Sequence, residues 1–268
     1  MSATCFECGH DLFKNTSNTC DYCGAFLLLQ IPGFSEQYEA MEYIYSGEQS
    51  DVFVVRDRIS SEYFLAKFYQ QIADYNSDEE DILAQLDHPA IPKLVTSFKT
   101  KDTICIVREY AGGTSLDKLS ISLNEKHVLE LCLQLCDILT YLHNLAPPVI
   151  HRDIKPQNII LDDDGKVYLI DFGISRNFSD DALKDTINIG TDGFMPPEQY
   201  GFKQTDCRSD IYSLGILLCW LLSGKKNPEA LTSLISSNLM GVINKCTAFS
   251  PEHRYHTADA VKEALLQV

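Results

Sequence analysis

The sequence predicts an α+β fold, in which a strand-rich part precedes a helix-rich part, behind a short cysteine-containing segment. Runs rich in β-branched and aromatic residues fill residues 42–110, and apolar residues at helical spacing dominate from residue 124 onward. Four of the ten cysteines fall within the first 23 residues. Strands followed by helices, rather than alternating with them, are typical of α+β domains.

Composition and charge narrow the classes of function. The 268 residues are 45% hydrophobic and 22% charged, which is ordinary for a soluble globular protein. A formal net charge of -16 argues against nucleic acid or an anionic membrane as a partner and favours a basic or neutral protein substrate. The longest apolar run, Leu214–Leu222, is too short to span a bilayer, and residues 1–9 lack the layout of a signal peptide. We therefore expect a cytoplasmic protein.

The N-terminal cysteines form two CxxC pairs, each followed by a glycine. A short CxxCG turn directs two thiolates at one point, and two such turns supply the four sulfurs of a tetrahedral Zn²⁺ site. The expected ligands are Cys5, Cys8, Cys20 and Cys23. Residues 1–30 are too few to fold around a core of their own, and they resemble a zinc ribbon whose folding depends on a structural metal. Two disulfides or an iron centre are the alternatives, and the other six cysteines are expected as reduced thiols.

Pro32 and Gly33 break the chain and indicate a linker over residues 31–37, followed by one domain over 38–268. The β-rich runs predict a five-stranded antiparallel sheet interrupted by one helix, with strands at 42–45, 52–56, 63–69, 94–98 and 103–110. Three more helices are predicted, from 124 onward, over 207–222 and over 231–245.

Two motifs in the helical part carry the chemistry. Residues 151–158 read HRDIKPQN, and residues 171–173 read DFG. Their acids, amide and lysine suit the task of holding Mg²⁺·ATP against a hydroxyl, because phosphoryl transfer depends mostly on positioning and on neutralising charge. The motifs resemble the catalytic and metal-binding loops of eukaryotic-like protein kinases, in particular the bacterial serine/threonine group. The resemblance implies a bilobal protein-kinase fold with an N-lobe at about 38–110 and a C-lobe at about 111–268.

The resemblance assigns a role to each charged or amide residue of the two motifs. Asp153 orients the substrate hydroxyl and accepts its proton, while Lys155 neutralises the transferring phosphoryl group. Asn158 and Asp171 hold Mg²⁺ or Mn²⁺ through oxygen ligands. These four residues are the expected catalytic core.

The loop that covers the phosphates in this family is where the sequence departs most from the pattern. With Val52 closing the G-x-G-x-x-G-x-V pattern, the three glycine positions are occupied by Tyr45, Gly47 and Ser50. Gly47 keeps a close backbone approach to phosphate, and Ser50 is small enough to tolerate one.

Leu65-Ala66-Lys67 resembles the strand end that carries the family's ATP-binding lysine. Ser77 and Glu80 form a capping box that opens a helix, on which Glu79 shares a face with the apolar residues Ile82, Leu83 and Leu86. Glu79 should therefore face inward, where Lys67 is the expected partner of its carboxylate. The interval between Lys67 and Glu79 is shorter than is usual in the family.

The resemblance also implies an adenine site between the lobes. The base would lie against Val52 and Ala66 on one side and Ile160 on the other, with hydrogen bonds from the backbone between Glu109 and Ala111.

Arg108 stands just before this hinge, where the family commonly has an apolar residue. A buried guanidinium needs a carboxylate, or it must keep its head in water. Arg108 is therefore expected to narrow the back of the adenine site, to pair with Glu79 in an inactive state, or to project outward.

Further matches to the family have structural roles: Gly190-Thr191, Pro196-Pro197-Glu198, Asp210, which braces the catalytic loop, and Arg254, the expected partner of Glu198. Arg152 beside Asp153 implies regulation by autophosphorylation in the activation segment, at Thr186 or Ser179.

The sequence thus predicts an ATP-dependent serine/threonine protein kinase that acts on protein substrates and has no nucleic-acid or membrane partner. A pseudokinase scaffold that binds nucleotide is the alternative, favoured by the poor glycine loop, Arg108 and the short helix. A small-molecule phosphotransferase is a third reading. The zinc ribbon is expected to recruit a partner, to form a dimer contact, or to dock rigidly on the N-lobe.

Overall fold

The computed structural model describes residues 31–46, 50–70, 79–101, 103–119, 123–178, 191, 193–200, 204–231 and 234–268. Outside these residues lie the predicted zinc ribbon and five other residues with predicted roles, Gly47, Ser77, Ser179, Thr186 and Gly190. The chain forms two compact units. Unit 1 contains the described residues up to 70 together with Lys93–Tyr110, and unit 2 contains residues 79–92 and the described part of Ala111–Val268.

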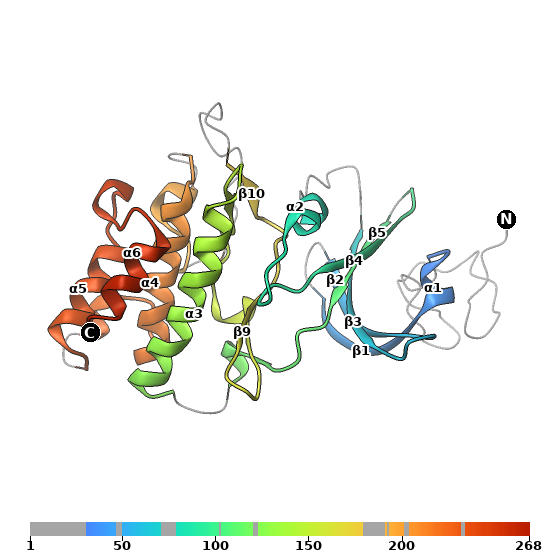
Figure 1. The fold of residues 1–268 in the computed structure, drawn as a ribbon, viewed down its shortest axis with the longest axis horizontal. Helices are drawn as coiled ribbons and strands as arrows, with labels where there is room; N and C mark the ends of the chain where they lie inside the picture. The colour runs from blue at the N-terminus through green and yellow to red at the C-terminus, as the bar shows by residue number, and fades with distance from the viewer. Residues whose placement is uncertain are drawn as a thin grey trace. The chain divides into compact units, whose positions relative to one another are not determined.

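Unit 1 is built on a five-stranded antiparallel sheet with the strand order β1-β2-β3-β5-β4 (Figure 1). Its strands are β1 (Tyr38–Ser46), β2 (Ser50–Asp57), β3 (Tyr63–Gln70), β4 (Leu94–Lys99) and β5 (Thr103–Glu109). The five strands predicted from the β-rich runs are confirmed, and β1 begins four residues earlier than expected because Tyr38 to Ala40 pair with the end of β2.

The predicted linker packs onto one face of this sheet. Within it, α1 (Phe34–Gln37) buries the ring of Phe34, which meets Phe68 edge-on with 5.1 Å between centroids and Phe98 with 5.6 Å. Gly33, at φ 82°, allows this approach, since a Cβ there would lie 3.3 Å from the Phe98 ring. We call this side the aromatic face; its buried core consists of Ile31, Phe34, Tyr38, Phe53, Val55, Ala66, Phe68, Cys105 and Val107.

Unit 2 is mainly helical. Its helices are α2 (Glu79–Gln85), α3 (Glu125–His143), α4 (Cys207–Ser223), α5 (Ser237–Cys246) and α6 (Ala258–Leu265). Figure 1 shows α3 beside α4, and α3 also packs against α6. The start of α3 is as predicted, because the Asn124 side chain accepts a hydrogen bond from the His127 amide at 2.9 Å and so caps the helix.

The helix predicted over 231–245 begins later, at Ser237. Ser236 caps it by accepting a hydrogen bond from the Leu239 amide at 3.1 Å, and residues Pro228–Leu231 form a separate short 3₁₀ helix, η6. A serine that bonds the backbone three residues ahead starts a helix rather than continuing one, which explains the difference.

Two small sheets position the loops of unit 2. One has the order β6-β8-β9, from β6 (Thr114–Ser115), β8 (Ile159–Leu161) and β9 (Val167–Leu169); the other pairs β7 (Val149–Ile150) with β10 (Arg176–Asn177). The HRDIKPQN motif spans the connection from β7 to β8, and DFG follows β9. No helix in the described ranges is long and apolar enough to cross a membrane.

Candidate active site

The connection between β7 and β8 is hydrogen-bonded to the side chain of Asp210, which lies on α4. Its carboxylate accepts hydrogen bonds from the backbone amides of His151 (2.9 Å) and Arg152 (2.8 Å) and lies 2.9 Å from His143 Nε2. Burial opposes the charged form of Asp210, but the hydrogen bond and charge of His143 and the charge of His151 hold its pKa below the ordinary value. This carboxylate therefore fixes the loop, including Arg152 at φ 68°, as predicted for Asp210.

Three of the predicted catalytic side chains meet around the Asp153 carboxylate. Asn158 Nδ2 donates to Asp153 Oδ2 at 2.8 Å and to the Asp153 carbonyl at 2.9 Å, while Lys155 Nζ lies 2.7 Å from Oδ2. The other carboxylate oxygen, Oδ1, accepts a hydrogen bond from the Thr191 hydroxyl at 2.9 Å. Lys155 Nζ in turn donates to Thr191 Oγ1 at 2.7 Å. An acid, an ammonium group, an amide and an aliphatic hydroxyl thus form one closed network.

Thr191 is expected from the sequence only as a structural match at the end of the activation segment, without a contact to Asp153. It lies 38 positions after Asp153, so no local pattern links the two. The Gly190-Thr191 match to the family indicates where the residue lies in the chain, but it does not identify Asp153 and Lys155 as the partners of its hydroxyl.

The backbone just before Asp171 is hydrogen-bonded to that of Asn158, the other predicted metal ligand. The Ile170 amide donates to the Asn158 carbonyl at 2.9 Å, which brings the start of DFG beside the end of the catalytic loop. Because the Asn158 amide nitrogen is used on Asp153, its oxygen is the group left to accept or to ligate. Phe172 is fully buried and packs edge-on to the His151 ring at 4.8 Å between centroids, so the backbone around Asp171 is anchored on both sides.

These oxygens fit the chemistry of Mg²⁺. Within the described residues, no three or more His, Cys, Asp or Glu side chains gather at one point as a metal site. Mg²⁺ commonly takes only one or two protein oxygens and completes its shell with water and substrate phosphates. One amide oxygen and one carboxylate therefore suffice for a nucleotide-bound metal.

In unit 1, strand alternation sorts the predicted nucleotide-binding residues between the two faces of the sheet. Val52 is in register with Lys67 across β2 and β3, so the two share a face. Ala66 pairs with Phe53 and Val107 and is fully buried in the aromatic face. The prediction that Ala66 shares an adenine surface with Val52 is therefore wrong, because adjacent residues of a strand point to opposite sides.

Leu65 takes the position predicted for Ala66, since it lies two residues before Lys67 and on the same face. The period of two along β3 would have indicated this from the sequence. The other predicted binding residues lie as follows. Ser50 is the first residue of β2, and the Glu109 amide, at the end of β5, donates to the Lys93 carbonyl at 2.9 Å. Ile160 is half-buried in β8, where it pairs with Tyr168 of β9. Ala111 follows β5 and is half-buried.

Two charged residues, Glu79 and Lys67, are buried, although acidic and basic side chains are rarely buried in proteins. Glu79, the first residue of α2, is 1% exposed and lies on the buried side of that helix with Ile82 and Leu83, as predicted. Lys67 is 7% exposed. Both groups have lost most of their water, so each needs a compensating charge.

Arg108 is also buried, at 5% exposed, which excludes the outward orientation. In register it lies opposite Leu65, on the Lys67 face of the sheet. Among the described residues, its Nη1 has no hydrogen-bond partner.

The activation segment is tied to unit 2 where it ends. Glu198 and Arg254 form a buried bidentate pair with distances of 2.6 and 2.8 Å, which confirms the pairing predicted from the sequence. The Ser209 hydroxyl donates to the same carboxylate at 2.9 Å.

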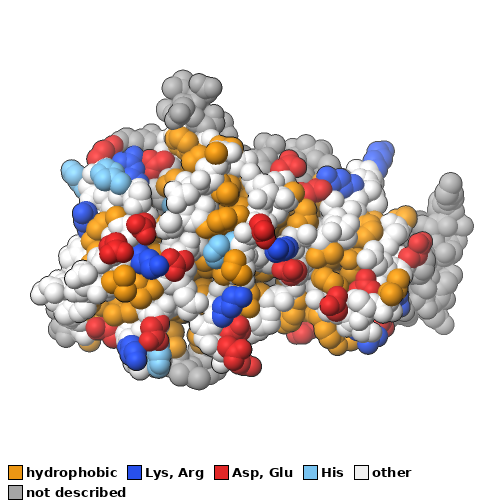
Figure 2. Space-filling view, viewed as in Figure 1, with side chains coloured by type: hydrophobic (Ala, Val, Ile, Leu, Met, Phe, Trp, Pro, Cys, Tyr) orange, Lys and Arg blue, Asp and Glu red, His pale blue; other side chains and the backbone are white. Residues whose placement is uncertain are grey.

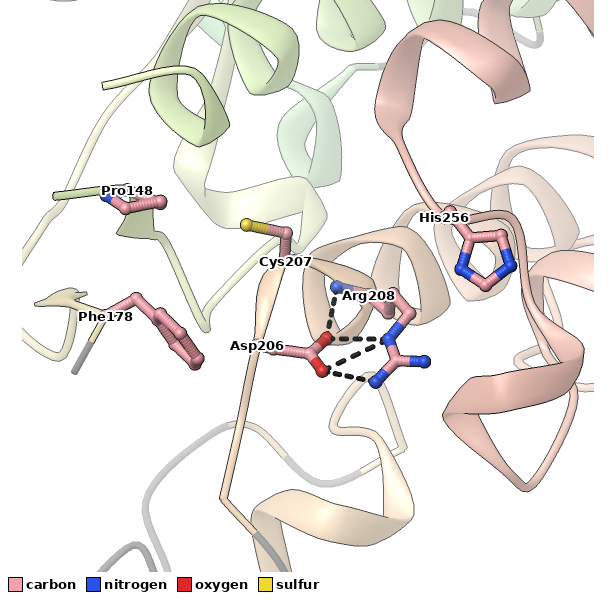
Figure 3. Close-up of a pocket in the computed structure, with 6 residues that line it drawn as sticks. All are labelled: Pro148, Phe178, Asp206, Cys207, Arg208 and His256. Carbon is pink, nitrogen blue, oxygen red and sulfur yellow. Dashed lines mark hydrogen bonds and ion pairs between the residues drawn. The ribbon is translucent and has the colours of Figure 1, made fainter. Parts of the chain in front are cut away.

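A separate hollow of about 220 Å³ lies elsewhere in unit 2 (Figure 3). It is lined by Pro148, Phe178, Asp206, Cys207, Arg208 and His256. Figure 3 shows the ion pair between Arg208 and Asp206. Burial raises the pKa of the Cys207 thiol to about 12, so this thiol is neutral at physiological pH. None of the predicted site residues lines this hollow, so it is not the candidate active site.

Comparisons with known proteins agree with this geometry. Residues 38–265 match the family model described as "Protein kinase domain". The chain is 30% identical over 245 residues to Serine/threonine-protein kinase AtPK1/AtPK6 of Arabidopsis thaliana, a match covering 87% of this chain and 50% of the relative. It is 29% identical over 295 residues to Serine/threonine-protein kinase B of Synechocystis sp., covering 97% and 50%, and 34% identical over 224 residues to Serine/threonine-protein kinase PknA of Nostoc sp., covering 74% and 39%.

The chain therefore spans about half the length, or less, of these relatives. The family model, by contrast, covers most of this chain, from the first strand of the sheet to the last helix. With its catalytic loop, its DFG motif and its Glu198–Arg254 pair in place, the chain belongs to the protein kinase domain family.

Proposed function

We propose that this protein is an ATP-dependent serine/threonine kinase that transfers the γ-phosphoryl group to hydroxyls of other proteins. The observation that supports it most is the hydroxyl of Thr191 bonded to both Asp153 and Lys155. The carboxylate and the ammonium group are thus already placed to hold an aliphatic hydroxyl between them. An acceptor serine or threonine needs the same two contacts.

In the proposed reaction, the acceptor oxygen forms a bond to the γ-phosphorus while the bond from that phosphorus to the β-γ bridging oxygen breaks. Asp153 orients the acceptor hydroxyl and takes its proton, and Asn158 holds the Asp153 carboxylate in place. Lys155 offsets the negative charge that accumulates on the transferring group.

Nucleotide and metal binding are proposed for residues of both units. Lys67 would hold the α- and β-phosphates, with Glu79 as the carboxylate that orients it, and Val52, Leu65 and Ile160 would contact the adenine. Asn158 and Asp171 would hold Mg²⁺ or Mn²⁺, which when bound would neutralise the phosphates.

The test is transfer of radiolabelled phosphate from ATP to a generic basic protein. Wild type should label the acceptor, and Asp153→Asn should lower the rate by at least about 100-fold, a typical contribution of a positioned base. Asp164→Asn, which changes an exposed carboxylate in the β8–β9 turn, serves as the matched control. Equal labelling by wild type and Asp153→Asn would contradict the proposal, and nucleotide binding without transfer would support the scaffold.

Autophosphorylation in the activation segment is a further part of the proposal. Arg152 is half-buried, and its Nη1 lies 3.5 Å from the carbonyl of Ile174, which precedes Ser179 and Thr186 in the sequence. A phosphate there would be attracted to this guanidinium. Mass spectrometry of active enzyme after incubation with ATP should find phosphate between Ile174 and Thr191, and its absence would remove this part of the proposal.

For residues 1–30 we propose a structural zinc ribbon with Cys5, Cys8, Cys20 and Cys23 as ligands, which recruits a partner or forms a dimer contact. The proposal rests on the cysteine spacing. The match to the Synechocystis kinase covers 97% of this chain and so includes most of this segment. The purified protein should contain one zinc per chain, and Cys5→Ser should lose it; the mass in solution with and without the first 30 residues tests the dimer contact.

A further inference from the structure

Arg108 places a positive charge inside unit 1, level with the end of the proposed nucleotide site that holds the base. In the register of β3 and β5, Arg108 lies opposite Leu65, and Ile106 lies opposite Lys67. Paired residues on neighbouring strands have Cβ atoms about 5 Å apart, whereas positions two apart along a strand are about 7 Å apart. If Lys67 holds the phosphates and Leu65 contacts the base, Arg108 is therefore next to the base.

The surroundings of Arg108 on this face of the sheet are apolar. Its register partners are Leu65 on β3 and Leu94 on β4, and Ile106, two residues earlier on its own strand, is 1% exposed. The acid that follows in sequence, Glu109, alternates to the other face, and its Oε2 accepts a backbone hydrogen bond at 3.0 Å. The aliphatic neighbours offer the guanidinium no acceptor.

The guanidinium of Arg108 has lost its water without a full set of acceptors to replace it. On the face drawn in Figure 2, basic side chains are interspersed with acidic ones at the surface, where water also solvates them. Arg108 is 5% exposed, and its Nη1 finds no hydrogen-bond partner within the described parts of the chain. A buried donor without an acceptor is costly, so a ligand that brings an acceptor to this position gains a hydrogen bond and removes that cost.

What a purine offers to such a donor depends on its substituent at C6. A guanidinium only donates hydrogen bonds. Adenine has an amino group at C6, which also donates, whereas guanine and hypoxanthine have a carbonyl oxygen, which accepts. Arginine for this reason pairs with O6 and N7 of guanine. A 6-oxopurine therefore suits the unpartnered donor of Arg108, and a 6-aminopurine places a second donor against it.

We infer that Arg108 recognises the C6 carbonyl of a purine nucleotide, so that the kinase uses GTP and ITP, the triphosphate of hypoxanthine riboside, as phosphoryl donors besides ATP. The inference rests on the proposed kinase activity and deepens it by naming the class of donor. The long side chain reaches the oxygen by rotation about its terminal bonds, with no change of the sheet. Arg108 discriminates between bases and does not touch the transferred phosphoryl group, so the bonds formed and broken are those of transfer from ATP.

The experiment measures phosphate transfer by the full chain from ATP, ITP and GTP to a generic basic protein. ITP is the decisive probe, because it has the C6 carbonyl of GTP and lacks the 2-amino group. Wild type should use ITP with a KM no higher than that for ATP. Arg108→Met, an apolar replacement of similar length, should raise the KM for ITP relative to ATP by about tenfold or more, the size of one hydrogen bond from a charged group.

Nucleotide binding without transfer gives a second readout. Titration with IDP and ADP should show the same change in the ratio of the two dissociation constants when wild type is compared with Arg108→Met. Arg108→Gln should reverse the preference towards ADP, because a carboxamide both accepts from the amino group of adenine and donates to N7. Arg58→Met, at an exposed arginine of the same unit, is the matched control and should leave the ratio unchanged.

The outcomes separate the role of Arg108 from the kinase activity. A wild-type KM for ITP well above that for ATP, or variants at Arg108 that change binding of both nucleotides equally, would overturn base recognition and leave the kinase proposal intact. If Arg108→Met does not fold, Arg108→Gln decides by the same comparison. Absence of transfer from every nucleotide would overturn the kinase proposal, while the IDP and ADP titrations would still decide whether Arg108 reads the base.

Discussion

Two buried arginines, one in each unit, differ in how completely their guanidinium groups are hydrogen-bonded. Arg254 in unit 2 is 1% exposed, and each of its five N–H groups has an acceptor: the two Glu198 oxygens and the carbonyls of Ala248, Arg208 and Phe249. The Tyr212 ring lies 4.8 Å from its guanidinium carbon. Arg108 in unit 1 is 5% exposed, and its Nη1 has no partner among the described residues.

The difference shows that burial alone does not define what a charged residue contributes. A guanidinium that has lost its water is stable only where fixed acceptors replace that water. Arg254 has this replacement and ties the end of the activation segment to the rest of unit 2. Arg108 has no acceptor for its Nη1 among the described residues, so a contribution to stability does not explain why an arginine stands at this buried position.

Arg254→Met should have the largest effect on this comparison. It leaves the Glu198 carboxylate buried without its counter-charge, which typically costs about 3–5 kcal/mol. Urea denaturation followed by circular dichroism measures the free energy of unfolding. The double variant Glu198→Gln with Arg254→Met should recover part of the loss, because no unpaired charge remains. A single variant as stable as wild type would show that the pair is not a structural tie.

Phe34→Ala tests the apolar packing of unit 1, which stabilises this unit where the ion pair of Arg254 stabilises unit 2. Removing a ring that lies against Phe68 and Phe98 should lower the unfolding free energy by about 3 kcal/mol. Ile59→Ala is a suitable control in the same unit, because Ile59 is 92% exposed. If Phe34→Ala changed stability no more than Ile59→Ala, residues 31–37 would be a connector rather than part of the unit.

The sequence was informative where a property is local. Strand alternation predicted the five strands, and the HRDIKPQN motif predicted Lys155 and Asn158, which contact the Asp153 carboxylate. Arg254 and Glu198 were paired correctly, although they are 56 positions apart, because a family resemblance supplied the contact.

It was uninformative where tertiary contacts decide. Proline and glycine at 32 and 33 indicated a linker, but only the folded sheet brings two phenylalanines to meet Phe34. Ala66 lies on the opposite face of the sheet from Val52 and Lys67, and the period of two along β3 indicates this from the sequence. The contacts of Lys226 with Gly193 and Phe194 join positions more than 30 apart and have no signature in the sequence.

The pH dependence of stability tests the buried polar groups of unit 2 with a smaller effect. Burial lowers the pKa of His151 below its ordinary value, although the charges of Asp210, Asp153 and Asp171 oppose this. The folded protein thus keeps His151 neutral, and its stability contribution is fully present above the unfolded pKa of about 6.5. Below that pH the unfolded chain binds a proton that the folded chain does not.

The unfolding free energy should therefore fall below about pH 6.5, with a slope of at most about 1.4 kcal/mol per pH unit from this residue. Urea titrations between pH 7.5 and 5.5 measure the slope, which should be shallower in His151→Gln. The exposed His127→Gln provides the control and should retain the wild-type slope. Identical slopes in all three proteins would show that His151 does not titrate in this range.

Arg108→Met should have the smallest effect and decides between the remaining roles of this residue. If the guanidinium is as poorly partnered in solution as in this structure, an apolar side chain of similar length should leave stability unchanged or raise it by about 1 kcal/mol. If Arg108 instead pairs with a carboxylate such as Glu79 in an inactive state, its removal should favour the active state and raise kcat. Arg58→Met, at an exposed arginine of the same unit, controls for the loss of a positive charge. A loss of 3 kcal/mol or more with unchanged kcat would show that Arg108 is housed as completely as Arg254, and the contrast between the two arginines would disappear.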